Sequence, residues 1–385
     1  MPYSCAQMDN SSPKQELERP VPLADAPPMK QKRLYANYIR AIAACAVVQM
    51  HCIGVYLYQY NLATPMDVNF ITSDIFYGHL RWATPFFIMI SGALLLRPTR
   101  EAEPLRLFLG KRLRRVLVPF AFWGTVYALY LFRGELYFGT GPSWGRVVDV
   151  IFYQDIYFHL WFIPMIAGLY ILTPALRVFT RTATRAEVEY YLALILFFNA
   201  LHHFLPGVFI VKHFAWFGYV GYYLLGYYLS AFPIAWNWKR IAYPLALLMP
   251  LLTAYGTWWL TVHQGTYNET LFVYASPNVL LMTGALFLFL KDFDWDTFAN
   301  RYPRVHKAVL YMAEVSYGVY FVHPIILDVL KNGYIFGLHI NPHNFFNYPL
   351  HPAIAGPLVA VLAIAMSVGV ITLMGKSATL KKWVM

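Results

Sequence analysis

Charged residues are scarce in this sequence, and acidic residues are the scarcest. Asp, Glu, Lys and Arg make up only 13% of the 385 residues, whereas hydrophobic residues make up 59% and the mean hydropathy is +0.46. A water-soluble chain of this length needs a more polar surface than this composition provides. The shortage of charge therefore predicts a protein that crosses a membrane several times.

The shortage of acidic residues leaves a formal net charge of +11. Nucleic-acid binding would require the basic residues to cluster on one folded surface. Here they are confined to short segments between apolar runs, which is the distribution that membrane topology produces. We therefore expect the protein to associate with the lipid bilayer and not with nucleic acid.

Cysteine is also rare. Cys5 lies in the polar N-terminal segment, and Cys45 and Cys52 lie inside an apolar run, so the sequence has no disulfide framework. The cysteines and histidines show no spacing typical of metal ligands. No metal cofactor is expected.

The distribution of polar residues divides the chain into three regions. Residues 1–33 are rich in Pro, Ser, Gln and charge and lack the pattern of a secretory signal peptide, so they are expected to form a disordered cytoplasmic tail. Residues 34–375 are predicted to form one membrane domain, and residues 376–385 a short cytoplasmic tail.

The membrane domain is predicted to be all-α, with about ten transmembrane helices. Crossing about 30 Å of hydrocarbon takes about 20 residues of α-helix. The apolar runs of suitable length begin near Leu34, His79, Val116, His159, Tyr190, Phe214, Ile241, Leu271, Ala308 and Ala353.

The basic residues predict the orientation of these helices. With the N-terminus in the cytoplasm, the inner segments contain 24 Lys and Arg residues and the outer segments contain 4. Cytoplasmic segments of membrane proteins carry the excess of Lys and Arg. Both termini are therefore predicted to be cytoplasmic.

Two further basic residues, Arg40 and Arg81, fall within predicted helices. Each costs about 2.5 to 3.5 kcal/mol at a helix centre, so each is expected to face the protein interior or a wet cavity. In "RAIAACAVVQMH", His51 follows Arg40 by eleven residues. An α-helix places such a pair on one face, about 16 Å apart along the axis. A snorkelling arginine and a hydrogen-bonded interhelical histidine are the alternative.

Four stretches resemble a known family. The Arg-x10-His helix and three later blocks resemble, in order and spacing, the acyltransferase 3 family of integral membrane acyltransferases over about Leu34 to Met374. The blocks are "LRWATPFFIMISGALLL" (Leu80–Leu96), "HLWFIPMIAGLYILTP" (His159–Pro174) and "SYGVYFVHPIIL" (Ser316–Leu327). The resemblance implies transfer of an acyl group, usually acetyl, from a cytoplasmic thioester to a sugar hydroxyl at or beyond the outer face.

The resemblance implies acetyl-CoA as the acyl donor. Lys111, Arg112 and Arg115 lie in "GKRLRRVLVPF", and Arg112 and Arg115, at i and i+3, match the basic pair that the family carries after its second helix. Arg40 is the expected anchor on the donor side, as a planar cation that binds pyrophosphate or polarises the carbonyl oxygen. The alternative is that these residues are basic only because cytoplasmic loops are basic.

His51 is the expected catalytic residue, together with Arg40. A neutral imidazole can accept the proton of a sugar hydroxyl as the hydroxyl attacks the thioester, or can itself carry the acetyl group. The sequence leaves both routes open.

Other residues are expected to support the acceptor side, namely Arg81, His159, Trp161, Tyr320 and His323. Arg81 is predicted about three residues into an inward-running second helix, at a depth comparable with that of His51, and His323 reaches a similar depth. Interfacial snorkelling, an aromatic belt and structural roles are the alternatives. Ser91 and Gly92 are typical of close helix packing and not of a nucleophile.

The sequence thus predicts a membrane-embedded O-acetyltransferase of the bacterial inner membrane that acts on an extracytoplasmic glycan or exopolysaccharide. The chain shows no fused outer domain of the kind that many family members carry, so either direct transfer or a separate periplasmic acyltransferase is expected. This stand-alone form is similar to transacylases of exopolysaccharide systems, including those of cellulose production. The alternatives are a transporter with a polar relay, and a structural subunit of a polysaccharide synthase.

Overall fold

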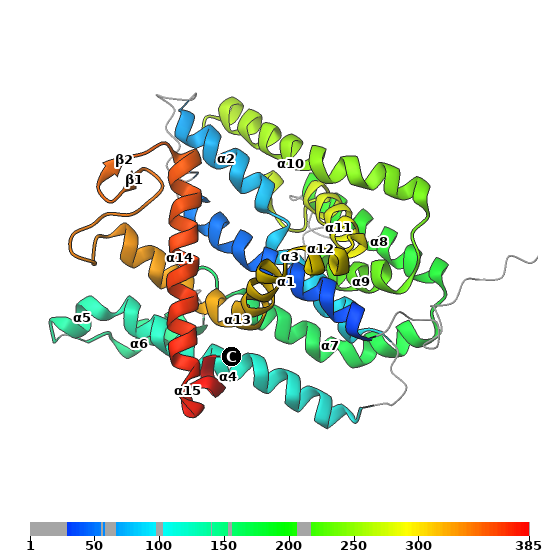
Figure 1. The fold of residues 1–385 in the computed structure, drawn as a ribbon, viewed down its shortest axis with the longest axis horizontal. Helices are drawn as coiled ribbons and strands as arrows, with labels where there is room; N and C mark the ends of the chain where they lie inside the picture. The colour runs from blue at the N-terminus through cyan, green and yellow to red at the C-terminus, as the bar shows by residue number, and fades with distance from the viewer. Residues whose placement is uncertain are drawn as a thin grey trace, which may run out of the picture.

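The computed structural model describes residues 29–54, 57, 67–97, 103–139, 141–152, 156–205 and 217–384, which form a largely helical molecule (Figure 1). Residues 1–28 of the predicted tail lie outside this part, and α1 begins at Met29. The helices are α1 (Met29–Ile53), α2 (Val68–Leu80), α3 (Ala83–Leu95), α4 (Leu105–Leu131), α5 (Arg133–Tyr137), α6 (Trp144–Phe152), α7 (Phe162–Thr182), α8 (Arg185–Phe204), α9 (Phe217–Ala231), α10 (Trp236–Gln264), the 3-10 helix η3 (Thr270–Phe272), α11 (Pro277–Asp292), α12 (Trp295–Arg301), α13 (Pro303–Lys331), α14 (Pro352–Gly375) and α15 (Ala378–Val384). Strands β1 (Asn344–Phe345) and β2 (Tyr348–Pro349) form a small antiparallel hairpin between α13 and α14.

Several helices begin at residues that suit a helix N-terminus. Pro277, Pro303 and Pro352 occupy the first turns of α11, α13 and α14. The first turn does not use its backbone N–H groups, so proline costs little there. Thr184 and Glu187 form a capping box at the start of α8, in which each side chain bonds to the backbone of the other residue.

The helices agree with a protein that crosses the membrane several times. Each of the ten predicted runs overlaps a helix. In the described part of the chain, six segments are long and apolar enough to span a bilayer: Leu34–Ile53, Phe162–Thr182, Trp236–Gln264, Thr270–Asp292, Pro303–Lys331 and Pro352–Gly375. The helices α3 and α9, with 13 and 15 residues, are shorter than a typical span. The count of ten and the orientation of the termini stay predictions.

The predicted position of Arg81, about three residues into the second helix, is wrong. The helix α2 occupies a stretch that the hydropathy pattern assigns to an outer loop, and α3 begins only at Ala83. Pro85 explains the break, because it has no N–H to bond to the carbonyl of Arg81 four residues earlier. Arg81 therefore lies at a junction between two helices.

Close contact between α3 and α9 depends on two glycines. A β-carbon on Gly92 would lie 1.8 Å from the carbonyl oxygen of Tyr223, and one on Gly226 would lie 2.0 Å from the carbonyl oxygen of Met89. The hydroxyl of Ser91 bonds to the backbone of its own helix. The prediction of close helix packing is confirmed at Gly92.

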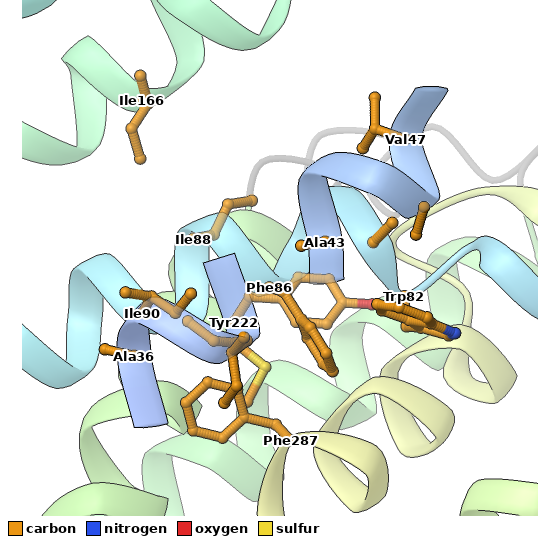
Figure 2. Close-up of a cluster of buried hydrophobic side chains, with 14 of the residues drawn as sticks. Ala36, Ala43, Val47, Trp82, Phe86, Ile88, Ile90, Ile166, Tyr222 and Phe287 are labelled. Atoms are coloured by element: carbon orange, nitrogen blue, oxygen red, sulfur yellow. The ribbon is translucent and has the colours of Figure 1, made fainter. Parts of the chain in front are cut away.

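The helix α1 lies at the centre of the molecule, packed against α13, α3 and α14 (Figure 1). In the core beside it, Phe86 of α3 packs edge-on against Phe287 of α11, with 5.8 Å between ring centroids, and Tyr222 of α9 lies next to them (Figure 2). Ala36 and Ala43 on α1 are buried in the same core. The small residues of α1 allow close packing of the helix that carries Arg40 and His51.

Candidate active site

Two histidines from helices far apart in the sequence meet near the end of α1. The Nδ1 atom of His51 lies 2.8 Å from the Nε2 atom of His323 on α13, and the two rings are nearly parallel, with 5.1 Å between centroids and 6° between planes. The Nδ1 atom of His323 lies 2.9 Å from the carbonyl oxygen of Val319, one turn earlier. A hydrogen-bonded chain therefore leads from His51 through a fully buried His323 to the backbone of α13.

A third histidine lies beside this pair. His159 belongs to the turn before α7, and its ring centroid is 5.9 Å from that of His323 and 5.1 Å from that of Tyr320. The hydroxyl of Tyr320 donates to the carbonyl oxygen of His159 at 2.5 Å and ties this turn to α13. The side chain of His159 is buried, and neither ring nitrogen has a hydrogen-bond partner within the described protein. Because buried polar groups are normally paired, His159 has hydrogen bonds to offer to a bound molecule.

Phe158 packs against His51. Its ring centroid lies 5.0 Å from that of His51 in an edge-to-face contact, and its side chain is 52% exposed.

Arg81 packs on an aromatic ring and contacts Met50, the residue before His51. Its guanidinium carbon lies 3.8 Å from the ring centroid of Tyr274, and its Nη1 atom lies 3.8 Å from the sulfur of Met50. The ring of Trp161 packs on the same Tyr274, with 5.7 Å between centroids. Arg81 also interacts electrostatically with His51. The structure thus brings Arg81 and Trp161 together beside the catalytic candidate.

Arginines gather in a second place, at the predicted cytoplasmic half. The guanidinium carbons of Arg177 on α7 and Arg112 on α4 lie 4.4 and 5.7 Å from the ring centroid of Phe108. The Nε atom of Arg112 is buried and has no hydrogen-bond partner within the described residues. Glu103 interacts with both arginines, but it is bonded to the largely exposed Lys111 at 3.0 Å. Lys111 is therefore not brought into the arginine group.

Arg40 extends the arginine group toward α1. It interacts electrostatically with Arg115 and with Tyr170 of α7. Arg112 and Arg115 lie three residues apart on α4, about one helical turn, so Arg115 joins Arg40 to the arginines beside Phe108. We call Arg40, Arg112, Arg115 and Arg177 the arginine cluster. Because like charges repel, an anion bound between these residues would stabilise the arrangement.

A row of aromatic side chains on α13 connects the two groups. Tyr317, Tyr320 and His323 follow one another at every third position, with 6.4 Å between each pair of neighbouring ring centroids. Tyr317 interacts electrostatically with Arg115, whereas His323 bonds to His51. The row therefore runs beside α1 from the arginine cluster to the histidines.

Comparison with known protein families decides what kind of protein carries this arrangement. Residues 33–375 match the model of an acyltransferase domain, the acyltransferase 3 domain. The chain belongs to the acyltransferase 3 family. It is thus a multi-pass membrane acyltransferase, and its activity requires an acyl donor. No curated protein and no solved structure matches the chain.

The site predicted for this acyltransferase is partly assembled in the structure. One group contains the residues His51, His159, Tyr320 and His323, with Arg81 and Trp161 adjoining it. The arginine cluster contains Arg40, Arg112 and Arg115 but not Lys111. Within the described ranges, no three His, Cys, Asp or Glu side chains are grouped so that they could hold a metal ion.

Three residues that lie next to the candidate site residues were not identified from the sequence. Arg177 lies in the last turns of α7, where the charge pattern counts it among the basic residues of a cytoplasmic segment. Phe158 and Tyr274 lie in short segments outside the helices, and no pattern distinguishes them from other interfacial aromatics.

Proposed function

We propose that this acyltransferase moves an acetyl group from cytoplasmic acetyl-CoA to a hydroxyl group of a glycan or exopolysaccharide on the outer side of a bacterial inner membrane. One observation carries the proposal. The His51–His323 pair and the arginine cluster lie at the two ends of the segment of α1 between Arg40 and His51. Transfer of an acyl group from a thioester that carries phosphate groups needs a base and an anion-binding site. The imidazole and the arginine cluster can provide these two groups.

The arginine cluster suits the donor. Coenzyme A carries phosphate groups, and guanidinium groups bind phosphate through paired hydrogen bonds. Three helices contribute the four arginines, and the buried Nε atom of Arg112 lacks a partner among the described residues. The described carboxylate Glu103 interacts with Arg112 and Arg177, and the phosphate groups of the donor would balance the positive charge that remains.

The histidine pair suits the transfer step. In this step, the Nε2 atom of His51 accepts the proton of the acceptor hydroxyl as the hydroxyl oxygen forms a bond to the thioester carbonyl carbon. The carbon–sulfur bond then breaks, and the departing thiolate takes the proton from His51, so that an ester and a thiol are formed. An acetyl group held temporarily on the same Nε2 atom is the other route.

The aromatic residues next to Arg81 suit a sugar acceptor. The rings of Trp161, Tyr219 and Tyr274 pack around each other, with 5.7 Å from Trp161 to each tyrosine. Sugar rings pack their apolar faces against aromatic rings, while their hydroxyls need hydrogen-bond partners such as the ring nitrogens of His159, which have none within the described protein. A separate periplasmic acyltransferase or a polysaccharide synthase is proposed as the partner that uses the product.

The proposal is tested with purified protein in nanodiscs supplied with acetyl-labelled coenzyme A and a glycan acceptor. Wild-type protein is expected to release free thiol and transfer the label, and His51→Ala is expected to do neither while still inserting. His263→Ala, which changes an exposed histidine at the end of α10, is the control and is expected to behave as the wild type. Labelled protein trapped only when His51 is present would favour the acyl-histidine route. Equal transfer by His51→Ala and wild type would contradict the proposal.

A further inference from the structure

We infer that His323 is a positioning residue, which holds His51 as the tautomer that has its proton on Nδ1 and its lone pair on Nε2. The inference rests on the proposed role of His51 as the group that accepts the proton. The inference goes beyond the proposed function in two respects: it names the atom of His51 that reacts, and it names the residue that keeps this atom unprotonated.

The carbonyl of Val319 fixes the first proton. A carbonyl oxygen only accepts hydrogen bonds, so the Nδ1 atom of His323, 2.9 Å away, must carry a proton and donate. A neutral imidazole has only one N–H group, so the Nε2 atom of His323 then carries a lone pair.

The same reasoning fixes the second proton. The Nε2 atom of His323 accepts, so the Nδ1 atom of His51, 2.8 Å away, must donate. In neutral His51 the remaining nitrogen, Nε2, therefore has no proton. This is the form of the ring that can accept a proton from a hydroxyl or attack a carbonyl carbon. Protonation of Nε2 during the reaction leaves the bond between the two histidines unchanged.

The backbone around His323 holds this chain in place. Tyr320 provides a second backbone partner for the ring of His323. Its carbonyl is not used by the helix, because Pro324, four residues later, has no N–H. The proline inside α13 thus leaves an acceptor beside the Nδ1–H group of His323.

In the described part of the chain, His323 is the neighbour of His51 that is placed to orient its ring. Among the described residues, the charged or titratable groups that interact with His51 are His323, Arg81 and His159. In many hydrolases a carboxylate orients the catalytic histidine. Here a neutral imidazole anchored to the backbone takes that place, which avoids placing an additional charge in the membrane interior.

Two substitutions of His323 distinguish its effect on the orientation of His51 from the effect of its size on packing. His323→Leu introduces an apolar side chain of moderate size and removes the acceptor, whereas His323→Gln places an amide oxygen where it can accept from His51. In serine proteases, loss of the orienting group lowers kcat about 10⁴-fold through the wrong histidine tautomer. We expect His323→Leu to lower kcat about 100-fold or more, with the KM values for donor and acceptor changed less than about threefold, and His323→Gln to recover at least about tenfold of the loss. Equal kcat values in the Leu and Gln variants would overturn the inference.

The tautomer itself can be measured without turnover. Nitrogen-15 solid-state spectra of histidine-labelled protein in nanodiscs report which ring nitrogen carries the proton, and subtraction of the His51→Ala spectrum identifies His51. We expect an unprotonated Nε2 in the wild type and a mixture of tautomers in His323→Leu. A protonated Nε2 in neutral wild-type His51 overturns this inference alone, whereas a wild type with the expected tautomer but no acyl transfer overturns the proposed function alone.

Discussion

At the scale of single residues, the site depends on a division between guanidinium and imidazole groups. The arginines keep their charge at any pH that proteins experience, so they suit permanent binding of phosphate. The imidazoles of His51 and His323 can exist as neutral rings, so they suit proton transfer. Arg40 and His51 lie on the same helix, so the helical rise sets their separation along the helix axis.

Arg40 is expected to need the planar shape of a guanidinium group. Arg40→Lys keeps the charge but loses paired hydrogen bonding to phosphate. A hydrogen bond to a charged group contributes about 1.5 to 3 kcal/mol, so kcat/KM for the donor should fall roughly 10- to 100-fold. Steady-state kinetics with acetyl-CoA measure this change. Full activity of Arg40→Lys would show that Arg40 contributes only positive charge.

Arg177 is expected to bind the donor, although the sequence alone did not identify it. Arg177→Gln should raise the dissociation constant for coenzyme A about tenfold, because it removes one cation from the arginine cluster. Arg106→Gln is the matched control, since Arg106 lies on α4 but is exposed and outside the cluster. Isothermal titration in nanodiscs measures both. Equal losses in the two variants would indicate a general effect of charge and no specific site.

The residues of the site differ in how well the sequence could identify them. Helical geometry is enough to place Arg40 and His51 on one face, because α1 is continuous through both. The contact between His51 and His323 joins two helices whose packing no local pattern encodes. Phe158 and Arg177 belong to the site only through tertiary structure, so their residue types alone resemble an ordinary interfacial aromatic and a topogenic charge.

At the scale of helices, close approach of backbones distinguishes α3 and α9 from the other pairs. Within a membrane, helices gain little from the hydrophobic effect and associate through close packing, which small residues permit. Gly92 and Gly226 each face a carbonyl oxygen of the opposite helix. The sequence indicated this packing at Gly92, but it did not reveal the break before α3, because the effect of Pro85 on a helix depends on its tertiary surroundings.

The two glycines of this contact are expected to be sensitive to a single methyl group. Gly92→Ala places a β-carbon 1.8 Å from the backbone of Tyr223, so the helices must move apart. Overpacking typically costs about 1 to 3 kcal/mol, so the melting temperature should fall by several degrees. Gly168→Ala on α7 is the control, since a β-carbon added there would have no neighbouring atom within 4 Å. Thermal unfolding followed by a thiol-reactive dye in detergent measures both, and equal melting temperatures would contradict the close contact.

At the scale of the whole molecule, length and charge suggest different numbers of membrane crossings. Six segments of the described chain satisfy the criteria of length and hydropathy, whereas the predicted ten crossings also include α3, α4, α8 and α9. Both numbers are even, so both place the two termini on the same side. The two topologies differ in where they place the segment before α4 and the segment after α8. If α3, α4, α8 and α9 do not cross the membrane, each of these segments lies on the opposite side from the one that ten crossings predict.

Cysteine labelling at these two segments distinguishes the two topologies. The background replaces the native thiols through Cys5→Ser, Cys45→Ala and Cys52→Ala. With ten crossings, Leu205→Cys should react with a membrane-impermeant maleimide in spheroplasts, and Arg106→Cys should react only after permeabilisation. Tyr137→Cys and Ala378→Cys are the controls, since both topologies place the first outside and the second inside. The excess of basic residues on one side favours ten crossings, because it places the arginine cluster and its phosphorylated donor in the cytoplasm. Labelling of Arg106→Cys in spheroplasts would favour six crossings, and would place Arg112 and Arg115 on a side of the membrane where acetyl-CoA is absent.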